Sequence, residues 1–259
     1  MDLGISGLNA LLLGSTQGLG LSCAQSLAEA GVRIVVNGRD AEKAEAVSKS
    51  IGAAGSACGD VSDPDARQAI VSKARQVLGG PIQILVTNAG GPPPGPLDTH
   101  THDVWLKALE GNMLAAIDFA RLVLDDMRGA GFGRIVNVTS FTVREPYPNM
   151  GLATGVRAGL TGAMASLSHE VAASGITVNN LLPGLMDTPA LKRVYDAQAA
   201  RENITPEAAK SRMAESVPVK RLGTADDFGP VCAFLCSRQA GYMTGQNITV
   251  DGGLVRALL

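Results

Sequence analysis

The sequence predicts an α/β protein built on a mainly parallel, doubly wound sheet of about seven strands, with helices on both faces. Short apolar runs of strand length alternate with helical patterns along the chain, which is typical of βα units on a parallel sheet. Hydrophobic residues make up 46% of the 259 residues, enough for one sizeable core. No repeat, low-complexity tract or linker divides the sequence, so we expect residues 1–259 to form a single domain.

The expected strands are continuous apolar runs, and glycines or prolines bound several of the helical segments between them. The strands are placed at residues 9–13, 33–36, 56–58, 82–87, 134–139, 177–182 and 247–250. Helices are placed at residues 21–30, 41–51, 63–78, 103–128, 152–173 and 226–237. Residues 103–128 form either one long helix or two joined helices, and residues 189–216 form a polar, charged helical excursion.

Charge and composition exclude several classes of partner. The chain has 22 Lys and Arg against 24 Asp and Glu, a formal net charge of −2, and only 3% of its residues are aromatic. It therefore lacks the basic excess and the stacking aromatic residues of a nucleic-acid-binding protein. No apolar stretch reaches the roughly 18–20 residues of a membrane helix, and the N-terminus lacks the basic start of a signal peptide. We expect a cytoplasmic protein whose partner is a small-molecule substrate, with neither nucleic acid nor membrane bound.

No metal site is expected. The three histidines lack metal-ligand spacing, and the four cysteines are scattered through a chain too long to need a disulfide framework. Among them, Cys232 and Cys236 lie four apart in an apolar run and are expected to be buried free thiols, like Cys23 and Cys58 without a metal or a disulfide.

A glycine-rich loop follows the first strand and opens the first helix. It reads Gly14, Ser15, Thr16, Gln17, Gly18, Leu19 and Gly20. Glycines let a chain turn sharply and bring backbone N–H groups close to a diphosphate at a helix N-terminus. Because the loop lies between a strand and a helix, it predicts a nicotinamide dinucleotide site, with a turn that binds no ligand as the alternative.

With its Gly-x-x-x-Gly-x-Gly spacing, the chain resembles the short-chain dehydrogenase/reductase family, in particular its β-ketoacyl-carrier-protein-reductase-like members. The resemblance spans nearly the whole chain. It continues through Asn88-Ala89-Gly90, Asn112, the strand ending in Ser140, and Val250-Asp251-Gly252-Gly253. It implies a Rossmann-type fold, a carbonyl or alcohol substrate with a 3-oxoacyl compound as one candidate, and a homo-oligomer, either tetramer or dimer.

The resemblance also assigns residues to the cofactor. Asp60 and Val61 match the family's adenine-contacting pair. The element Asn88, Ala89 and Gly90 lies beside the cofactor in relatives, and Pro183, Gly184 and Thr188 match the stretch beside the nicotinamide amide.

The end of the second strand favours NADP(H) over NAD(H). An acidic residue there binds the ribose 2′-hydroxyl and repels a 2′-phosphate. Here Arg39 can pair with a phosphate, and Asn37 does not repel one. Asp40 is the opposing observation, although it also fits the N-cap of the next helix.

The helix after Ser140 departs from the family pattern. Relatives carry a Tyr and a Lys four residues apart on one helix face. The resemblance implies that the phenol protonates the carbonyl oxygen, while the Lys lowers the pKa of the phenol and holds the nicotinamide ribose. The corresponding positions here are Ala153 and Arg157. Alanine donates no proton, and Arg157 is expected to make either a ribose contact or a structural salt bridge.

Other residues are candidates for the missing chemistry. Tyr147, seven residues past Ser140, is either a stand-in proton donor or a surface aromatic between two prolines. Glu145 is a donor only if its pKa is raised. Ser140 either polarises the substrate carbonyl or satisfies the end of its strand, and Asn112 either holds a catalytic water or kinks its helix.

Two functions of different classes follow. Residues 189–216 lie where relatives carry a substrate lid, although two amphipathic helices covering the core would give the same pattern. The first hypothesis is an NADP(H)-dependent oxidoreductase with an altered acid site. The second is a nucleotide-binding protein without catalysis, acting as a regulatory or structural subunit. The missing Tyr and Lys favour the second, whereas Ser140 and Asn112 favour the first.

Overall fold

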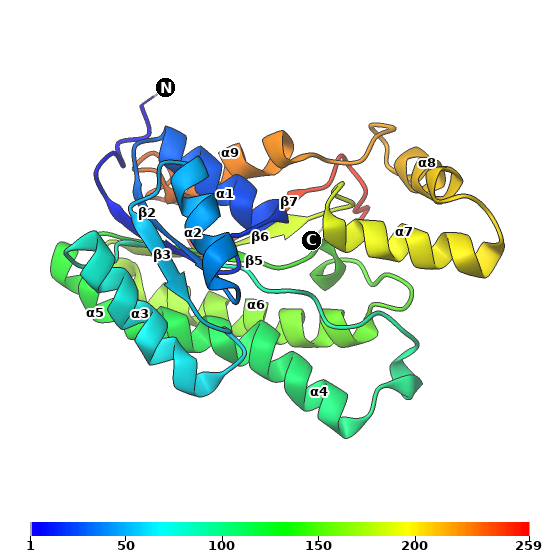
Figure 1. Cartoon of the computed structure of the whole chain (residues 1–259), viewed down its shortest axis with the longest axis horizontal. Coiled ribbons are helices and arrows are strands. Elements are labelled where there is room, and N and C mark those ends of the chain that lie inside the picture. Colours follow the sequence, from blue (N-terminus) through cyan, green and yellow to red (C-terminus); the bar gives the residue numbers. More distant parts are fainter. Residues whose placement is uncertain (1, 259) are drawn as a thin grey trace.

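One parallel sheet organises the chain, and the computed structural model describes residues 2–258. The strand order is β3-β2-β1-β4-β5-β6-β7, so the predicted fold class is confirmed (Figure 1). The strands are β1 (Asn9–Leu12), β2 (Arg33–Gly38), β3 (Gly55–Cys58), β4 (Ile84–Thr87), β5 (Gly133–Val138), β6 (Ile176–Pro183) and β7 (Asn247–Val250).

Helices follow the strands in βα order. They are α1 (Gly18–Glu29), α2 (Ala41–Ser50), α3 (Pro64–Leu78), α4 (His102–Leu109), α5 (Ala115–Ala130), α6 (Gly151–Val171), α7 (Pro189–Glu202), α8 (Pro206–Ser216) and α9 (Ala225–Cys236). Helix α1 begins three residues earlier than predicted, because the extended backbone of Gln17 (φ −169°) forms its N-cap.

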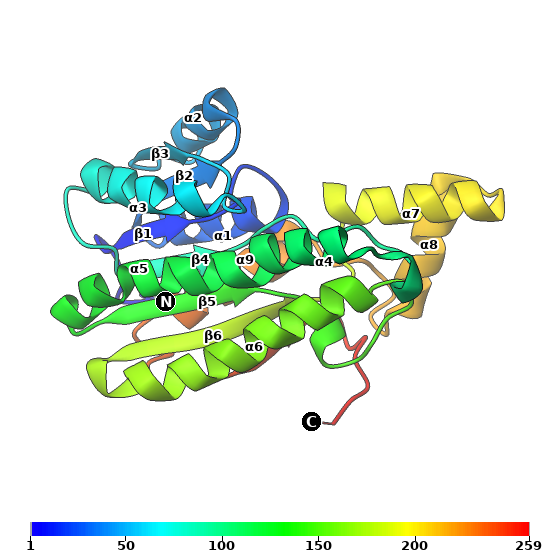
Figure 2. The same cartoon turned by 90° about the horizontal axis from the view of Figure 1, so that it is seen from below.

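Two apolar cores lie on opposite faces of the sheet. Ile70 of α3, Phe119 of α5 and Leu160 of α6 belong to one core. Leu27 of α1 and Phe228 of α9 belong to the other. Figure 2 shows the first group of helices along one face, with α1 and α9 behind the strands. Each face of the sheet is therefore covered, which is why the strands are apolar on both sides.

The segment predicted as residues 103–128 is a pair of joined helices. Helices α4 and α5 run into each other through a π-helical turn, Glu110–Leu114. Single π turns are frequent at functional sites. This one carries Asn112 and lies next to the side chain of Arg67, whose Nη2 donates to the Glu110 carbonyl at 3.3 Å.

Residues 189–216 form two helices, α7 and α8. The first ends where Asn203 adopts the left-handed conformation (φ 53°), and Thr205 caps the second through its hydroxyl. Both pack into a separate apolar cluster that includes Tyr195, Met213 and Phe141. Because Phe141 directly follows Ser140, this excursion lies over the end of β5.

The order in which strands are added changes direction at β1: β2 and β3 lie on one side of it, and β4 to β7 lie on the other. In doubly wound sheets, ligands bind beyond the carboxyl ends of the strands at such a point. The glycine loop, Asn88, Ser140 and Gly184 all follow strands at this edge of the sheet.

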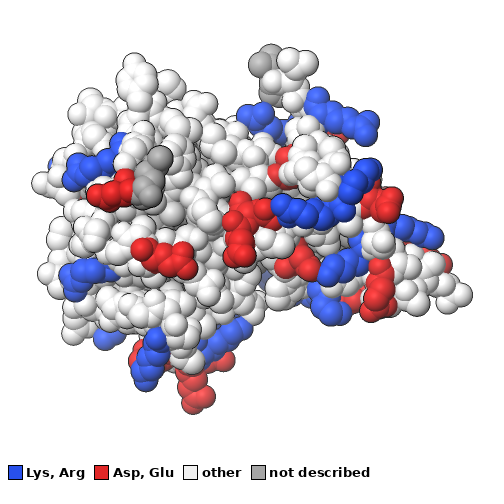
Figure 3. All heavy atoms as spheres, turned by 90° about the horizontal axis from the view of Figure 1, so that it is seen from above, with Lys and Arg blue, Asp and Glu red and all other residues white. Residues whose placement is uncertain are grey.

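Among residues 2–258, no helix is both long and apolar enough to span a membrane. In the same part of the chain, no group of three or more His, Cys, Asp or Glu is arranged to hold a metal ion. Figure 3 shows basic and acidic side chains interspersed on one face, with neither sign covering a large continuous area.

Candidate active site

The glycine loop has no room for side chains at two of its glycines. A Cβ on Gly20 would lie 2.3 Å from the carbonyl oxygen of Gly14, and a Cβ on Gly14 would lie 2.6 Å from that of Asn88. Gly14 and Gly18 also have positive φ angles, 54° and 57°. Side-chain-free turns of this kind let backbone N–H groups approach a bound group closely.

The loop leads into an open helix N-terminus. The N-cap Gln17 makes no side-chain capping bond, and the first turn of α1 has no acidic residue. Its first N–H groups are therefore available to an anion, and the helix dipole favours negative charge at this end. A diphosphate fits this position.

Two polar residues of the loop region hold the loop rather than face outward. Ser15 is fully buried, and its hydroxyl donates to the Leu12 carbonyl at 2.7 Å. Asn37 is 1% exposed. Its Oδ1 accepts from the Gly14 N–H at 3.2 Å, and its Nδ2 donates to the carbonyls of Ala57 and Gly59. The Asn37 amide is therefore occupied in supporting the loop.

Charged residues gather where β2 and β3 end. The guanidinium of Arg39, 81% exposed, lies 3.8 Å from the Asp60 carboxylate. Burial alone would raise the pKa of Asp60, but hydrogen bonds from Ser62 and the charge of Arg39 hold it below its usual value. Lys43 donates from Nζ to Oε1 of Gln17 at 2.7 Å, so α2 brings a second cation to the glycine loop. Lys43 is not among the residues predicted for the site, although its place four residues after Arg39 was a usable signal.

The loop after β4 closes the other side of the glycine loop. Nδ2 of Asn88 donates to the Gly14 carbonyl at 2.8 Å. A small cavity of about 20 Å³ lies below, large enough for one water molecule. Its lining comes from several of the predicted site residues together: Val61, Asn88, Ala89, Asn112 and Arg157, with Leu13, Thr87, Gly111, Ala115, Ala116, Val138 and Leu160 completing it.

Ser140 lies at the end of β5 and starts a short helical turn. Its Oγ accepts from the Thr142 N–H at 3.2 Å and lies 3.1 Å from the Thr142 hydroxyl. Ser140 is partly exposed, so its hydroxyl also has a side open to the edge of the sheet.

Ala153 and Arg157 lie one turn apart on α6, which contains neither Tyr nor Lys. Ala153 is 8% exposed. Nη1 of Arg157 donates to the Thr139 carbonyl at 2.7 Å. No Asp or Glu oxygen of residues 2–258 lies within 4.0 Å of its guanidinium. The salt-bridge alternative for Arg157 therefore finds no partner in this part of the chain. Burial lowers the pKa of Arg157 to about 10.

Tyr147 and Glu145 lie in the loop that joins β5 to α6. The Tyr147 ring meets Phe141 edge-on at 5.5 Å between centroids and packs on the α7–α8 cluster. It is thus half-buried under the excursion. Glu145 accepts from the Arg256 N–H at 2.7 Å, so its carboxylate holds the C-terminal segment.

The end of β6 leads into α7 beside the glycine loop. A Cβ on Gly184 would lie 2.5 Å from that of Asp251, which leaves glycine as the fitting residue there. Thr188 caps α7, and its Cβ lies 4.0 Å from the position of a Cβ on Gly18. Lys210 of α8 contacts Asp187 at 2.7 Å, which ties the excursion to this segment.

The parallel sheet, the glycine loop and the polar residues at the strand ends together define a dinucleotide-binding α/β protein. Comparison with known proteins gives the family. A family described as enoyl-(acyl carrier protein) reductase matches residues 14–255. The chain belongs to the short-chain dehydrogenase/reductase family and is an NAD(P)-dependent oxidoreductase of that type.

Similar proteins have several activities. The chain is 32% identical to a 3-oxoacyl-(acyl-carrier-protein) reductase of Haemophilus influenzae, over 95% of this chain and 97% of the relative. It is 29% identical to the NADPH-dependent reductase BacG of Bacillus subtilis, over 96% and 98%. Among solved structures, L-sorbose reductase of Gluconobacter frateurii, complexed with NADPH and L-sorbose, has a TM-score of 0.93 at 29% identity and covers 100% of both chains.

Proposed function

We propose that the protein is an NADP(H)-dependent oxidoreductase acting on a carbonyl or alcohol, with 3-oxoacyl compounds among the candidate substrates. The carrying observation is a glycine loop in which Gly20 approaches Gly14 too closely for a side chain, followed by a helix α1 whose first N–H groups have no side-chain cap. A diphosphate is the group that such a cradle recognises. The described relatives include NADPH-dependent enzymes, which supports the same cofactor class.

The bound dinucleotide would supply or accept a hydride, and the chain's own residues would hold it. In this proposal the glycine loop binds the diphosphate, and Asp60 and Val61 contact the adenine. Arg157 and the segment after β6 hold the nicotinamide end. The proposed cofactor residues are Gly14, Ser15, Thr16, Gln17, Gly18, Leu19, Gly20, Asn37, Arg39, Asp60, Val61, Asn88, Ala89, Gly90, Arg157, Pro183, Gly184 and Thr188. Within this set, Ser15 and Asn37 act by supporting the loop.

The preference for NADP(H) rests on Arg39, with Lys43 beside it. A guanidinium pairs with a phosphate in a bidentate way, whereas a ribose hydroxyl gains little from it. Arg39→Ala is expected to raise the Kd for NADPH at least 10-fold and to leave that for NADH within twofold, measured by titration of cofactor fluorescence. Lys49→Ala, an exposed cation further along α2, is the control. Tighter binding of NADH than of NADPH by the wild-type protein would overturn the preference.

The proposed catalytic residues are Ser140, Asn112, Arg157 and Tyr147. Ser140 donates a hydrogen bond to the substrate oxygen from the end of β5. Asn112 and Arg157 line the same small cavity, so a water held there would connect the two side chains. Tyr147, packed against Phe141, is the tyrosine nearest to Ser140 in the sequence and the proposed stand-in acid.

Catalytic inactivity is the second candidate, and the absence of Tyr and Lys from α6 favours it. Loss of a general acid costs about 10²–10⁴-fold in rate, which weakens hydride transfer without forbidding it. A screen of carbonyls and alcohols with NADPH or NADP⁺ separates the two candidates. Turnover that Ser140→Ala abolishes supports the oxidoreductase. NADPH binding without any such turnover supports a regulatory or structural nucleotide-binding subunit.

We also propose that the protein assembles as a homo-oligomer, a tetramer or a dimer. Strand β7 pairs with β6 along one side and is the last strand of the sheet order, so its other edge is open to pairing or covering. Light scattering of the purified protein measures the assembly, and a monomer at micromolar concentration would contradict it.

A further inference from the structure

Arg67 and Arg134 are buried, whereas Arg157 is partly buried and its guanidinium has fewer partners. Arg67 has both Glu110 and Asp118 as ion-pair partners. Arg134 is 4% exposed, and its guanidinium donates to the carbonyls of Ser237, Gly133 and Gly175. The guanidinium of Arg157 has one hydrogen bond within residues 2–258, to the Thr139 carbonyl. Since a guanidinium has five N–H donors, most of those on Arg157 are left for water or a bound group.

The unused side of Arg157 faces the substrate edge of the sheet. Its Nη1 reaches the carbonyl just before Ser140, and its Nη2 lies 3.5 Å from the position of a Cβ on Gly91. Gly91 belongs to the loop after β4, and Ser140 follows β5. The guanidinium therefore bridges the ends of neighbouring strands, beside the hydroxyl proposed to hold the reacting oxygen. The absence of a side chain at Gly91 leaves this approach open.

A neutral partner would not compensate the charge. Arg157 keeps its positive charge at neutral pH, although burial lowers its pKa to about 10. Ribose hydroxyls accept hydrogen bonds but carry no charge, whereas a carboxylate supplies two acceptor oxygens and the opposite charge. The free N–H groups of the guanidinium and the missing counter-ion both favour an oxyanion as its ligand.

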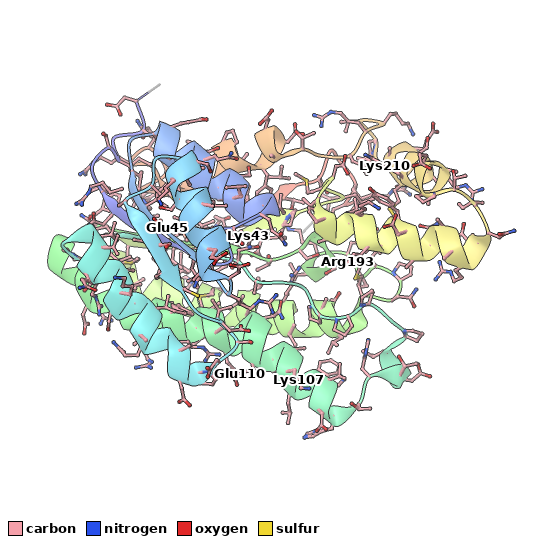
Figure 4. All side chains as sticks on the ribbon, in the orientation of Figure 1. Lys43, Glu45, Lys107, Glu110, Arg193 and Lys210 are labelled. Atoms are coloured by element: carbon pink, nitrogen blue, oxygen red, sulfur yellow. The ribbon has the colours of Figure 1, made fainter. Side chains whose placement is uncertain are left out.

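Two further cations lie on helices near this edge of the sheet. Figure 4 shows Lys107 on α4 and Arg193 on α7, the helices that border this edge. Neither side chain has an Asp or Glu oxygen within 4.0 Å among residues 2–258. Exposed cations near a binding site raise the local concentration of anionic ligands.

We propose that Arg157 binds a carboxylate carried by the substrate, so that the preferred substrates are free oxo acids rather than neutral ketones, esters or thioesters. The inference rests on the proposed oxidoreductase function. The cofactor also carries oxyanions, but its diphosphate has its own cradle at the start of α1. A substrate carboxylate is therefore the source to which the proposal commits, and a cofactor phosphate is the alternative that the test separates.

The test compares an acid with its neutral analogues. Acetoacetate, 2-oxobutyrate, methyl acetoacetate and the acetoacetyl thioester of N-acetylcysteamine are titrated into the free protein and into its NADP⁺ complex. Trp105, the single Trp of the chain, reports binding because its ring lies 3.1 Å from the position of a Cβ on Gly155 of α6. At least one of the two acids is expected to bind at least 10-fold more tightly than the neutral compounds, and to show the lower KM where turnover occurs.

Variants of Arg157 then locate the preference. Arg157→Met is expected to weaken acid binding at least 10-fold and ester binding less than threefold. Because Arg157 also belongs to the proposed cofactor set, the Kd for NADPH is expected to rise too, but by a smaller factor than that for the acids. Arg157→Lys keeps the charge and is expected to retain part of the preference. Arg128→Met, which removes an exposed arginine at the end of α5, is the charge-matched control.

Three results would overturn the proposal. The first is saturable binding of the ester or thioester as tight as that of the acids, and the second is no saturable binding of either acid. The third is a loss of NADPH affinity in Arg157→Met equal to or larger than the loss for the acids, which would assign the guanidinium to the cofactor alone. Failure of NADPH to bind the wild-type protein would instead contradict the proposed function, because the titrations on the free protein still report on the carboxylate site.

Discussion

Nδ2 of Asn88 donates a 2.8 Å hydrogen bond to the carbonyl oxygen of Gly14, and this bond attaches the glycine loop to the end of β4. Without it, the loop would lose a fixed contact on the side opposite Asn37, and the Gly14 carbonyl would lose its partner. We expect Asn88→Ala to raise the Kd for NADPH about 10-fold and to lower the free energy of unfolding by about 1–2 kcal/mol. Calorimetric titration and chemical denaturation measure the two effects. An unchanged Kd in a destabilised variant would show that the bond serves stability alone.

Two glycine-to-alanine substitutions are expected to differ: one should abolish dinucleotide binding, and the other should stabilise the fold. In Gly20→Ala the new Cβ would meet the Gly14 carbonyl at 2.3 Å, so the loop must move and dinucleotide binding should be lost. Gly162 of α6 has nothing within 4 Å of its Cβ position, and Ala is the better helix former. Gly162→Ala should therefore raise the free energy of unfolding by about 0.5–1 kcal/mol. Titration with NADPH and thermal unfolding provide the comparison, and equal NADPH affinity in both variants would contradict the proposed cradle.

The reactivity of the thiols provides a chemical probe of the cofactor site. Cys58 is exposed, and its thiol donates to the Arg39 carbonyl at 3.4 Å, whereas Cys23, Cys232 and Cys236 are buried. Hydrogen bonding among the neighbouring thiols and burial raise the pKa of Cys232 and Cys236. Ellman's reagent should therefore label one thiol per folded chain rapidly. NADPH should slow that reaction, because Arg39 belongs to the proposed 2′-phosphate site. A rate that saturating NADPH leaves unchanged would contradict this placement.

The sequence was sufficient for the parts of the fold that local chemistry determines. The strand runs predicted the sheet, because buried parallel strands are apolar along their length. The glycine loop was predicted as a tight turn, and Gly14 and Gly20 indeed leave no room for a Cβ. The π turn that joins α4 to α5 was not predicted. Its stabilising contact comes from Arg67, 43 residues earlier in the chain, and such long-range contacts leave no local pattern.

The candidate site was predictable as a set of residues but not as a set of contacts. The sequence offered Asn37 as a residue that would tolerate a phosphate, whereas its amide is buried under the glycine loop. Arg157 had two possible partners, and only the three-dimensional arrangement shows that no carboxylate of the described residues reaches it. The place of Tyr147 against Phe141 likewise depends on packing between segments, which residue spacing does not encode.

Restoring the family's acid pair should increase any reductase activity. Ala153 and Arg157 lie one turn apart on α6, the spacing that places two side chains on one helix face. Ala153→Tyr combined with Arg157→Lys is expected to raise kcat by about 10²-fold where a general acid limits the rate. Ala153→Phe with Arg157→Lys has the same ring without the hydroxyl and serves as the matched control. Equal rates in the two double variants would show that the phenol donates no proton at this position.

The uncompensated charge of Arg157 should cost stability. Burial lowers its pKa to about 10, so the protonated side chain is less favourable in the folded protein than in the unfolded chain. Arg157→Met should therefore raise the free energy of unfolding of the ligand-free protein by about 1 kcal/mol, and its Tm by about 2–4 °C. Below pH 9 the side chain is protonated in both states, so the cost is fully present. Above the folded pKa the unfolded chain binds more protons, so stability rises with pH there and the cost declines. Calorimetry should thus give a Tm difference between variant and wild type that is constant from pH 6 to pH 9. A lower Tm for Arg157→Met would show that the hydrogen bond to Thr139 stabilises the fold by more than the partly buried charge destabilises it.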